Sequence, residues 1–172
     1  MTDALMYAKY NMECDATVYD ILSRMSNAQR EEARGSFYGS LSGLLRHVLG
    51  GTYFFLTLIK PALEGNAAAL KTISSMPEIP GDGELDGEGW RKLGETMKAV
   101  DAAYVDMAQA LGAADMGLPV KLDWYGGNPD SVPLSFMLSQ LLVHNTHHRG
   151  QISQILDGMK IENDFSGIGI LP

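Results

Sequence analysis

The sequence predicts an all-α fold, an up-down-up-down four-helix bundle that forms one domain over residues 1–172. Apolar residues recur at three- and four-residue steps in four long segments, and this spacing places side chains on one face of a helix. One short segment alternates as a strand does, and the chain contains no internal repeat. A length of 172 residues, with 45% hydrophobic and 20% charged residues, is typical of a single globular domain.

The first helix is expected over residues 3–25, with Thr2 and Asp3 as candidate N-terminal caps. Ser26-Asn27 is its expected end, and a charged stretch over residues 29–34 follows. The apolar positions with helical spacing in this segment are Leu5, Ala8, Met12, Ala16, Tyr19 and Leu22.

A second helix is expected over residues 36–59, with Ser36 as its capping candidate and Pro61 close to its end. Gly50-Gly51 lies within this helix, where each glycine costs about 0.5–1 kcal/mol relative to alanine. We expect these two glycines to permit close packing against another helix rather than to break their own.

The connection over about residues 64–89 is expected to be a long acidic surface segment with a short helix over residues 67–73. Connections of this length are either functional lids or solvated excursions, and we favour the second interpretation. The residues that interrupt regular structure here, and the acidic residues between them, are Pro77, Pro80, Gly81, Asp82, Gly83, Glu84, Asp86, Gly87, Glu88 and Gly89.

Helical spacing returns over residues 90–111 and is expected to end at Gly112. Apolar residues then alternate over residues 118–124, which predicts an extended segment that closes on the turn residues 126–129. Ser131 and Pro133 are expected to open a last long helix that runs to about Met159. The apolar tail over residues 164–172 is expected to pack back on the bundle.

The charge balance excludes some classes of protein. Thirteen Lys and Arg residues against twenty-one Asp and Glu residues give a net charge of −8, and no basic cluster suited to nucleic acid is present. The N-terminus lacks a signal-peptide pattern, and apolar runs such as Tyr53–Leu56 are too short to span a bilayer, so we expect a cytoplasmic protein. The single cysteine, Cys14, cannot close an intrachain disulfide and is expected to be a small buried apolar residue.

Three of the four histidines lie close together in the last helix, as His144, His147 and His148, and the fourth is His47 in the second helix. At about 100° per residue, His144 and His148 project within about 40° of each other, one helical turn apart. This spacing lets two imidazoles bind one metal ion. The apolar stripe of the helix indicates that His148 points inward and His144 lies near the stripe's edge. His147 is expected to face outward or toward a neighbouring chain.

His47 is the only other histidine, and two interpretations of it stay open: a metal ligand, or a core residue satisfied by hydrogen bonds. Burying two imidazoles without partners is costly, which favours a metal shared by His144 and His148. Three histidine ligands would leave coordination positions free for water or substrate, as in catalytic sites. No His-Glu-x-x-His protease motif is present.

The string HNTHHRGQ, residues 144–151, resembles the C-terminal metal-site signature of the DinB/YfiT-like superfamily. This superfamily consists of metal-binding four-helix proteins and is distinct from the DNA polymerase of similar name. Tyr10-Asn11, Ser40 to His47, and Leu122 to Gly127 extend the similarity over most of the chain. The resemblance is weaker between Leu63 and Ala114.

The resemblance implies an up-down four-helix bundle, a homodimer, and one divalent metal ion near one end of the bundle. The implied ligands are His47, His144 and His148, with water in the remaining coordination positions. In characterised branches of this superfamily the metal helps to activate a low-molecular-weight thiol for transfer or isomerisation.

The leading functional hypothesis is therefore a metal-dependent enzyme, a thiol transferase, an isomerase or a hydrolase, acting on a small molecule. The bound ion would lower the pKa of water or of a thiol. Zn or Ni is the ion expected first, and Fe or Mn is also compatible. The alternative is a non-catalytic metal- or ligand-binding stress-response module, since no carboxylate base stands beside the histidines in the sequence. A bundle with purely structural, hydrogen-bonded histidines is a third hypothesis.

Other polar residues near the motif have open roles. Arg149 and Gln151 could orient metal ligands or substrate, or Arg149 could pair on the surface and Gln151 could bond a neighbouring helix. Tyr7, Tyr10 and Asn11 are weaker pocket candidates, because aromatic residues at helical spacing usually belong to a core.

Overall fold

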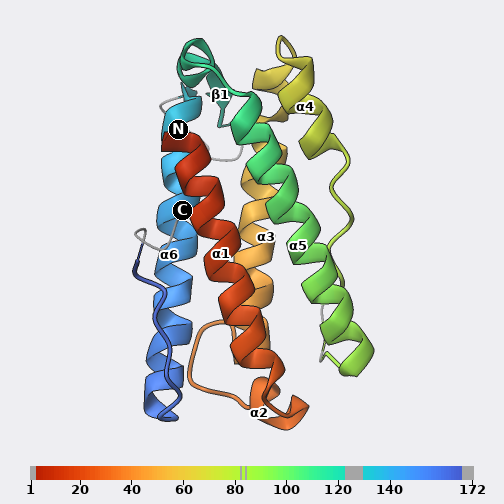
Figure 1. Cartoon of the computed structure of the whole chain (residues 1–172), viewed down its shortest axis with the longest axis vertical. Coiled ribbons are helices and arrows are strands. Elements are labelled where there is room, and N and C mark those ends of the chain that lie inside the picture. The colour runs from red at the N-terminus through yellow and green to blue at the C-terminus, as the bar shows by residue number, and fades with distance from the viewer. Residues whose placement is uncertain (1–2, 82, 84, 123–129, 168–172) are drawn as a thin grey trace.

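A computed structural model of the chain describes residues 3–81, 83, 85–122 and 130–167. Four long helices run along the molecule (Figure 1): α1 (Asp3–Ser23), α3 (Leu41–Ile59), α5 (Gly87–Ala110) and α6 (Leu134–Gly158). Between them lie α2 (Asn27–Glu31), η1 (Lys60–Leu63), α4 (Ala67–Ser74), η2 (Ala113–Gly117), β1 (Pro119–Lys121) and β2 (Ser131–Pro133). The all-α fold predicted from the periodicity is confirmed.

The long helices do not alternate in direction as the sequence suggested. α1 packs against α5 and α6, and α3 packs against α6 and α5. Asn66, just beyond α3, donates to the carbonyl of Ala110 at the end of α5 (3.1 Å), so α3 and α5 finish at the same end of the bundle. Arg46, near the start of α3, donates to the carbonyl of Gly83, just before α5. The two helices are therefore parallel, because the connection over residues 60–86 runs back along the length of the bundle (Figure 1).

That connection contains the short helix that the sequence predicted. It is α4, which packs on α5 through the fully buried Ala69 and Ile73. The described acidic residues of the segment (Glu64, Glu78, Asp86 and Glu88) are exposed, as expected, whereas Asp82 and Glu84 lie outside the described residues.

Helix boundaries differ from the predictions where capping residues act. Ser26 caps α2, with Gln29 completing the reciprocal pair of hydrogen bonds, so part of the charged stretch is helical. Ser40, not Ser36, caps α3 by accepting from the amide of Gly43 (3.1 Å). The third long helix begins at Gly87 rather than Trp90, because Asp86 caps it. Thr2 lies outside the described residues.

The predicted extended segment is shorter than expected within the described residues. β1 pairs antiparallel with β2, with Val120 opposite Val132, while residues 123–129 lie outside the described part. Ser131 and Pro133 were expected to open the last helix. They belong instead to β2, because this pairing holds them extended, and α6 starts at Leu134.

The C-terminal segment packs back on the bundle as predicted, as far as it is described. Phe165 is buried, and its carbonyl accepts a hydrogen bond from the hydroxyl of Tyr10 on α1. Residues 168–172 lie outside the described residues.

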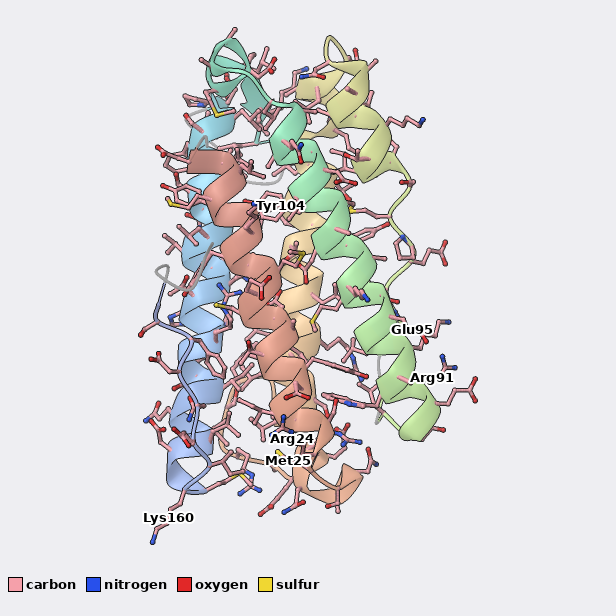
Figure 2. All side chains as sticks on the ribbon, in the orientation of Figure 1. Arg24, Met25, Arg91, Glu95, Tyr104 and Lys160 are labelled. Atoms are coloured by element: carbon pink, nitrogen blue, oxygen red, sulfur yellow. The ribbon has the colours of Figure 1, made fainter. Side chains whose placement is uncertain are left out.

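The core lies along the common axis of the four long helices. Figure 2 shows Tyr104 inside the bundle and Arg91 and Glu95 on the outer face of α5. Fully buried residues from each long helix meet there, among them Val18, Leu44, Leu56, Val100, Leu141 and Ile152. No helix in the described part of the chain is both long enough and apolar enough to cross a membrane.

Candidate metal centre

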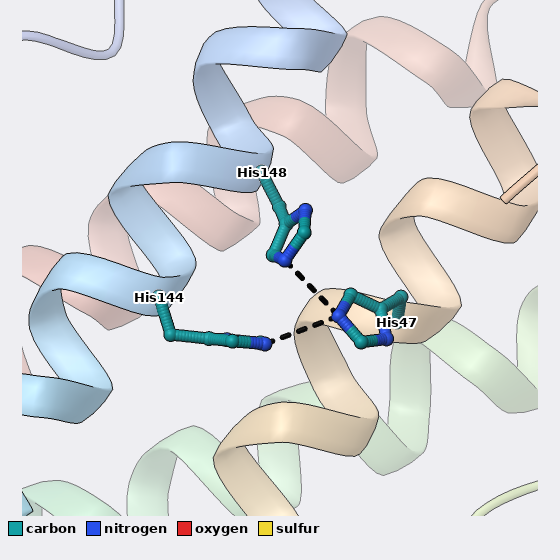
Figure 3. A group of neighbouring side chains, drawn as sticks. All are labelled: His47, His144 and His148. Carbon is teal, nitrogen blue, oxygen red and sulfur yellow. Dashed lines mark hydrogen bonds between the residues drawn. The ribbon is translucent and has the colours of Figure 1, made fainter. Parts of the chain in front are cut away.

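Three histidines from two helices point toward one another between α3 and α6 (Figure 3). His144 and His148 lie one turn apart on α6, as their spacing predicted, and His47 faces them from α3. His148 is buried, and the other two are half-buried. We refer to these three residues as the histidine cluster.

Two of the separations between ring nitrogens, those from His47, match the separation expected of ligands to one ion. Nε2 of His47 lies 3.1 Å from Nε2 of His144 and 3.1 Å from Nε2 of His148. One potential ligand atom from each residue lies within 4.8 Å of the others. Two nitrogens bound to one zinc ion at about 2.0–2.1 Å, with an angle between 90° and tetrahedral, lie about 2.8–3.4 Å apart. The donor set therefore fits a divalent metal ion.

Two amide side chains determine which nitrogen of each α6 histidine carries a proton. Nδ2 of Asn145 donates to Asn11 and to Thr52, both at 2.7 Å, so Oδ1 of Asn145 must accept from Nδ1 of His144 (2.9 Å). Oε1 of Gln151 likewise accepts from Nδ1 of His148 (2.8 Å). Both Nε2 atoms are therefore left with an exposed lone pair, as metal ligation requires.

The electrostatics of the cluster favour neutral rings. Burial, followed by the proximity of His148 and His144, lowers the pKa of His47 from 6.5 to about 4. Burial also lowers the pKa of His148. A proton on Nε2 of His47 could point to only one facing nitrogen, whereas one cation is shared by all three lone pairs. With the proton of His47 on Nδ1, the cluster presents three lone pairs to one point, and a metal ion is the partner that all three can share.

Aromatic rings enclose the histidine cluster. The ring of Tyr38 stacks on His47 with centroids 3.8 Å apart, and it meets the ring of His148 edge to face with centroids 5.3 Å apart. Phe55 on α3 meets His144 edge to face at 5.6 Å. Tyr38 can lie here because Gly43 has no Cβ, since one would lie 2.0 Å from the carbonyl oxygen of Tyr38.

Gly51 provides the space for His144. A Cβ at residue 51 would lie 2.1 Å from Cε1 of His144 and 2.6 Å from its Nδ1. A Cβ at Gly50 would meet nothing within 4 Å. The close helix packing expected at this glycine pair is therefore a property of Gly51, where α3 approaches α6.

Arg149 corrects one of the interpretations left open by the sequence, because it does not pair on the surface. It is 1% exposed and donates from Nη1 to Asp15 (2.9 Å) and Asn11 (2.8 Å). The residue after His148 turns by about 100° around the helix, so it faces α1 instead of α3. Asn11 also donates to Asp101 on α5 (2.8 Å). We refer to Asn11, Asp15, Asp101 and Arg149 as the Arg149 network.

The Arg149 network reaches the histidine cluster through one residue. Asn145 donates to Asn11 on one side and accepts from His144 on the other. Burial, and then the neighbouring Asp15 carboxylate, raises the pKa of Asp101 well above 3.8, which favours its neutral form. The network thus pairs the guanidinium of Arg149 with the carboxylate of Asp15. Asn145 connects this network to His144 of the histidine cluster.

The remaining candidates lie away from the histidine cluster. Tyr10 bonds the C-terminal segment, and Asn11 belongs to the Arg149 network. Tyr7 is half-buried near Tyr104. Cys14 is buried as predicted, and burial raises the pKa of its thiol. His147 is exposed, as predicted for one of its two possible orientations.

Sequence reasoning missed Tyr38, Thr52, Asn145 and Asp101. Asn145 lies inside the HNTHHRGQ string, so its position beside His144 was an available signal. Tyr38 and Asp101 come from segments distant in the sequence, and only the packing brings them to these positions.

Comparison with known proteins gives one match. The family model described as the DinB family matches residues 1–159. No curated protein and no solved structure matches the chain in the corresponding comparisons. The matched region runs from α1 to the end of α6 and includes both helices that carry the histidine cluster, and the chain belongs to the DinB family.

Proposed function

We propose that this protein binds one divalent metal ion through His47, His144 and His148 and is a metal-dependent enzyme that activates a low-molecular-weight thiol or water. The observation that carries the proposal is the convergence of three Nε2 atoms, with 3.1 Å from His47 to each of the other two. Membership of the DinB family is compatible with it. Zn or Ni is the ion we expect, and Fe or Mn also suits imidazole ligands.

A bound divalent ion lowers the pKa of a coordinated thiol or water, which supplies a nucleophile near neutral pH. The protein's own groups prepare for this chemistry. Asn145 and Gln151 keep the protons of His144 and His148 on Nδ1 and hold both rings in orientation. Tyr38 and Phe55 cover the rings and limit the access of water.

Coordination positions left open by the protein support a catalytic role over a structural one. Among the described residues, no carboxylate or thiol joins the three histidines in the group that could hold an ion. Three protein ligands leave room for an exchangeable ligand, as in catalytic zinc sites, whereas structural sites are closed by four.

Metal content tests the binding step directly. The purified full-length chain is incubated with Zn²⁺ or Ni²⁺, desalted and analysed for metal. We expect on the order of one ion per chain for the wild type and for His147→Ala, which changes the exposed neighbouring histidine. His148→Ala should retain almost none. Equal metal content in His148→Ala and the wild type would overturn the proposal.

Activity separates the enzyme from a non-catalytic module. A panel of small thiols and electrophiles is assayed with the metal-loaded protein, with and without chelator. Turnover that chelator abolishes and added metal restores supports the enzyme. The alternative is a non-catalytic metal- or ligand-binding module, and the observation in its favour is that no carboxylate base stands beside the histidines in the sequence. Stoichiometric metal without turnover across the panel would favour that alternative.

A further inference from the structure

A groove of about 500 Å³ lies between α1 and α5, two helices that pack side by side (Figure 1). This volume is within the range of roughly 300–1,000 Å³ that small-molecule sites occupy. None of the three residues of the histidine cluster is among the described residues that line it, so the groove is separate from the candidate metal centre. We call it the Asp101 groove, after the buried acidic residue of α5 in its lining.

The lining of the Asp101 groove is largely apolar. Ala16 on α1 and Gly94 on α5 are small, and a Cβ at Gly94 would lie 2.2 Å from Cζ of Tyr19. The missing side chain therefore lets the ring of Tyr19 lie against α5. Met12 and Met97 add unbranched side chains, which adapt readily to the shape of a bound molecule. This lining suits an apolar body such as a phenyl ring or a short alkyl chain.

Asp101 supplies the buried polar group of the groove. It is 3% exposed, and its one hydrogen bond within the described chain is the one that Oδ1 accepts from Asn11 (2.8 Å). Oδ2 has no partner there, yet it is not one of the unpartnered side-chain atoms that the described chain encloses completely. Because Asp101 lines the groove, this oxygen is open to a molecule bound in it. A buried acceptor without a partner is costly, and a donor on a ligand would satisfy it.

The other charged residues of the lining do not supply that partner. They are Glu13, Glu95, Arg91 and Lys98, and all four are exposed. Arg91 and Glu95 pair with each other on the outer face of α5 (Figure 2). Within the described chain neither Arg91 nor Lys98 forms an ion pair with Asp101. The buried end of the groove thus carries an acidic group without a countercharge of its own.

From α1 and α6, Asp101 faces the rest of the Arg149 network. Burial, and then the Asp15 carboxylate, raises the pKa of Asp101, while Asn11 and Arg149 act in the opposite direction. The guanidinium of Arg149 is already paired with Asp15 (2.9 Å), so it does not neutralise a second carboxylate. A cationic donor in the groove would provide Asp101 with both a countercharge and a hydrogen bond.

We propose that the Asp101 groove is a second small-molecule site, which binds an organic amine in its ammonium form. The ammonium group donates to Oδ2 of Asp101, and the apolar body of the amine lies against Met12, Met97 and Tyr19. The inference goes beyond the metal-dependent function proposed above and does not depend on it, since no ligand of the proposed ion lines this groove.

The test uses isothermal titration calorimetry of the full-length, metal-free protein with two series of probes. One series is the phenylalkylamines with two to four methylene groups, and the other is the phenylalkanols of the same lengths. Both are measured at one pH, below the pKa of the amines, and at one ionic strength. At the length that fits best, the amine should bind about tenfold more tightly than the alcohol, as expected for one charge-assisted hydrogen bond.

One pair of variants assigns this preference to the buried carboxyl. Asp101→Asn keeps an oxygen that can accept from Asn11, and it should reduce the ratio of amine to alcohol affinity to about one. Asp106→Asn removes the same charge from an exposed aspartate of the same helix that does not line the groove. It should leave the ratio unchanged, which separates a specific contact from attraction to the net charge of the chain.

A second pair of variants tests the groove itself. Ala16→Leu places a larger side chain in the groove and should weaken amines and alcohols alike, by about tenfold or more. Ala102→Leu adds the same side chain at an exposed alanine outside the groove and should leave both affinities unchanged. Matched melting temperatures establish that each variant is folded, and the Ala16→Leu pair decides the question if Asp101→Asn does not fold.

Three results would overturn the inference. They are no binding of either series, equal affinities for amine and alcohol in the wild type, and an amine affinity that Asp101→Asn or Ala16→Leu leaves unchanged. Zinc content, measured on the same preparations, keeps the two proposals apart. A chain that binds one zinc ion but shows no preference for amines would leave the proposed function standing and this inference wrong.

Discussion

The bundle contains two clusters of polar side chains, the Arg149 network and the histidine cluster. They differ in the partners that their polar atoms face. In the Arg149 network a buried cation meets a buried anion, and each amide hydrogen of Asn11 finds a carboxylate. In the histidine cluster three ring nitrogens face one another. In the first arrangement the two opposite charges pair within the chain, although Nε and Nη2 of Arg149 have no hydrogen-bond partner among the described residues, whereas in the second the ring nitrogens converge on a point that a cation from outside the chain can occupy.

The difference separates a structural role from a binding role. Buried polar groups persist when they are paired, and breaking such a pair is costly. Acceptors that converge without a shared proton are stabilised only when a cation arrives. Asn145 joins the two clusters, so the structural network also fixes the orientation of one candidate ligand.

The largest effect is expected in the Arg149 network. Arg149→Met leaves the Asp15 carboxylate buried without its cation, and we expect a loss of about 3–5 kcal/mol in the free energy of unfolding. Urea denaturation of the metal-free protein measures it. Adding Asp15→Asn to the same chain should recover part of the loss.

The control is the exposed ion pair of Arg91 and Glu95 on the outer face of α5 (Figure 2). Arg91→Met should cost no more than about 1 kcal/mol, as is usual for pairs in solvent. Similar losses in the free energy of unfolding for Arg149→Met and Arg91→Met would show that the buried network contributes no more to stability than an exposed ion pair.

A metal ion should stabilise the protein through the histidine cluster and not through the Arg149 network. Zinc at one hundred times its dissociation constant should stabilise the wild type by about 2.7 kcal/mol. His144→Ala should remove this gain, and it should also cost the metal-free protein about 1–3 kcal/mol, because the buried Oδ1 of Asn145 loses the hydrogen bond from Nδ1 of His144. Thermal melts with zinc and with chelator test both statements, and a gain from zinc that survives in His144→Ala would contradict them.

The two adjacent glycines of α3, Gly50 and Gly51, allow a test in which a single methyl group is added on either side of the same helix turn. Gly51→Ala places Cβ against the ring of His144 and should weaken metal binding at least tenfold, or by about 1.4 kcal/mol. Gly50→Ala meets open space and should stabilise the helix by about 0.5–1 kcal/mol with unchanged metal affinity.

Competition with a chromogenic chelator measures the metal affinity of both glycine variants. If Gly51→Ala binds metal as tightly as Gly50→Ala, then α3 and α6 do not approach as closely as the geometry of Gly51 requires.

The smallest expected effect is a dependence of stability on pH in the metal-free protein. The pKa of His47 is about 4 in the folded chain and 6.5 ordinarily, so between these values the unfolded state binds more protons. Stability should therefore fall as the pH drops from 6.5 toward 4. We expect a loss of about 1 kcal/mol from this residue, because the ring is partly solvated.

Urea denaturation at several pH values, compared between the wild type and His47→Gln, isolates that contribution. The other imidazoles that face His47 are those of His144 and His148, and both remain in the variant. An identical loss in the two proteins between pH 6.5 and 4 would mean that His47 is not the group responsible.

Local sequence rules predicted the α6 half of the histidine cluster. His144 and His148 are four residues apart, and the helical repeat by itself puts them on one face. The apolar stripe also predicted that His148 is buried and supports the exposed position of His147. The participation of His47 was implied only by the resemblance, since nothing local connects it to α6.

The same rules did not predict the surroundings of Arg149. An arginine is usually a surface residue, and the burial of Arg149 depends on Asp15 and Asn11 of α1 being opposite it. The direction of α5 was equally hidden, because it depends on the path of the connection over residues 60–86.

The sequence by itself determined the long helices and the i, i+4 histidine pair, because each depends on residues a few positions apart, whereas only the structure showed that Gly51 and not Gly50 lets two helices meet. Tertiary structure decided which nitrogens converge, which arginine is buried, and that a buried carboxyl lines the groove between α1 and α5. The reason is physical: periodicity fixes the face of a helix, but only the packing of whole helices fixes what that face meets.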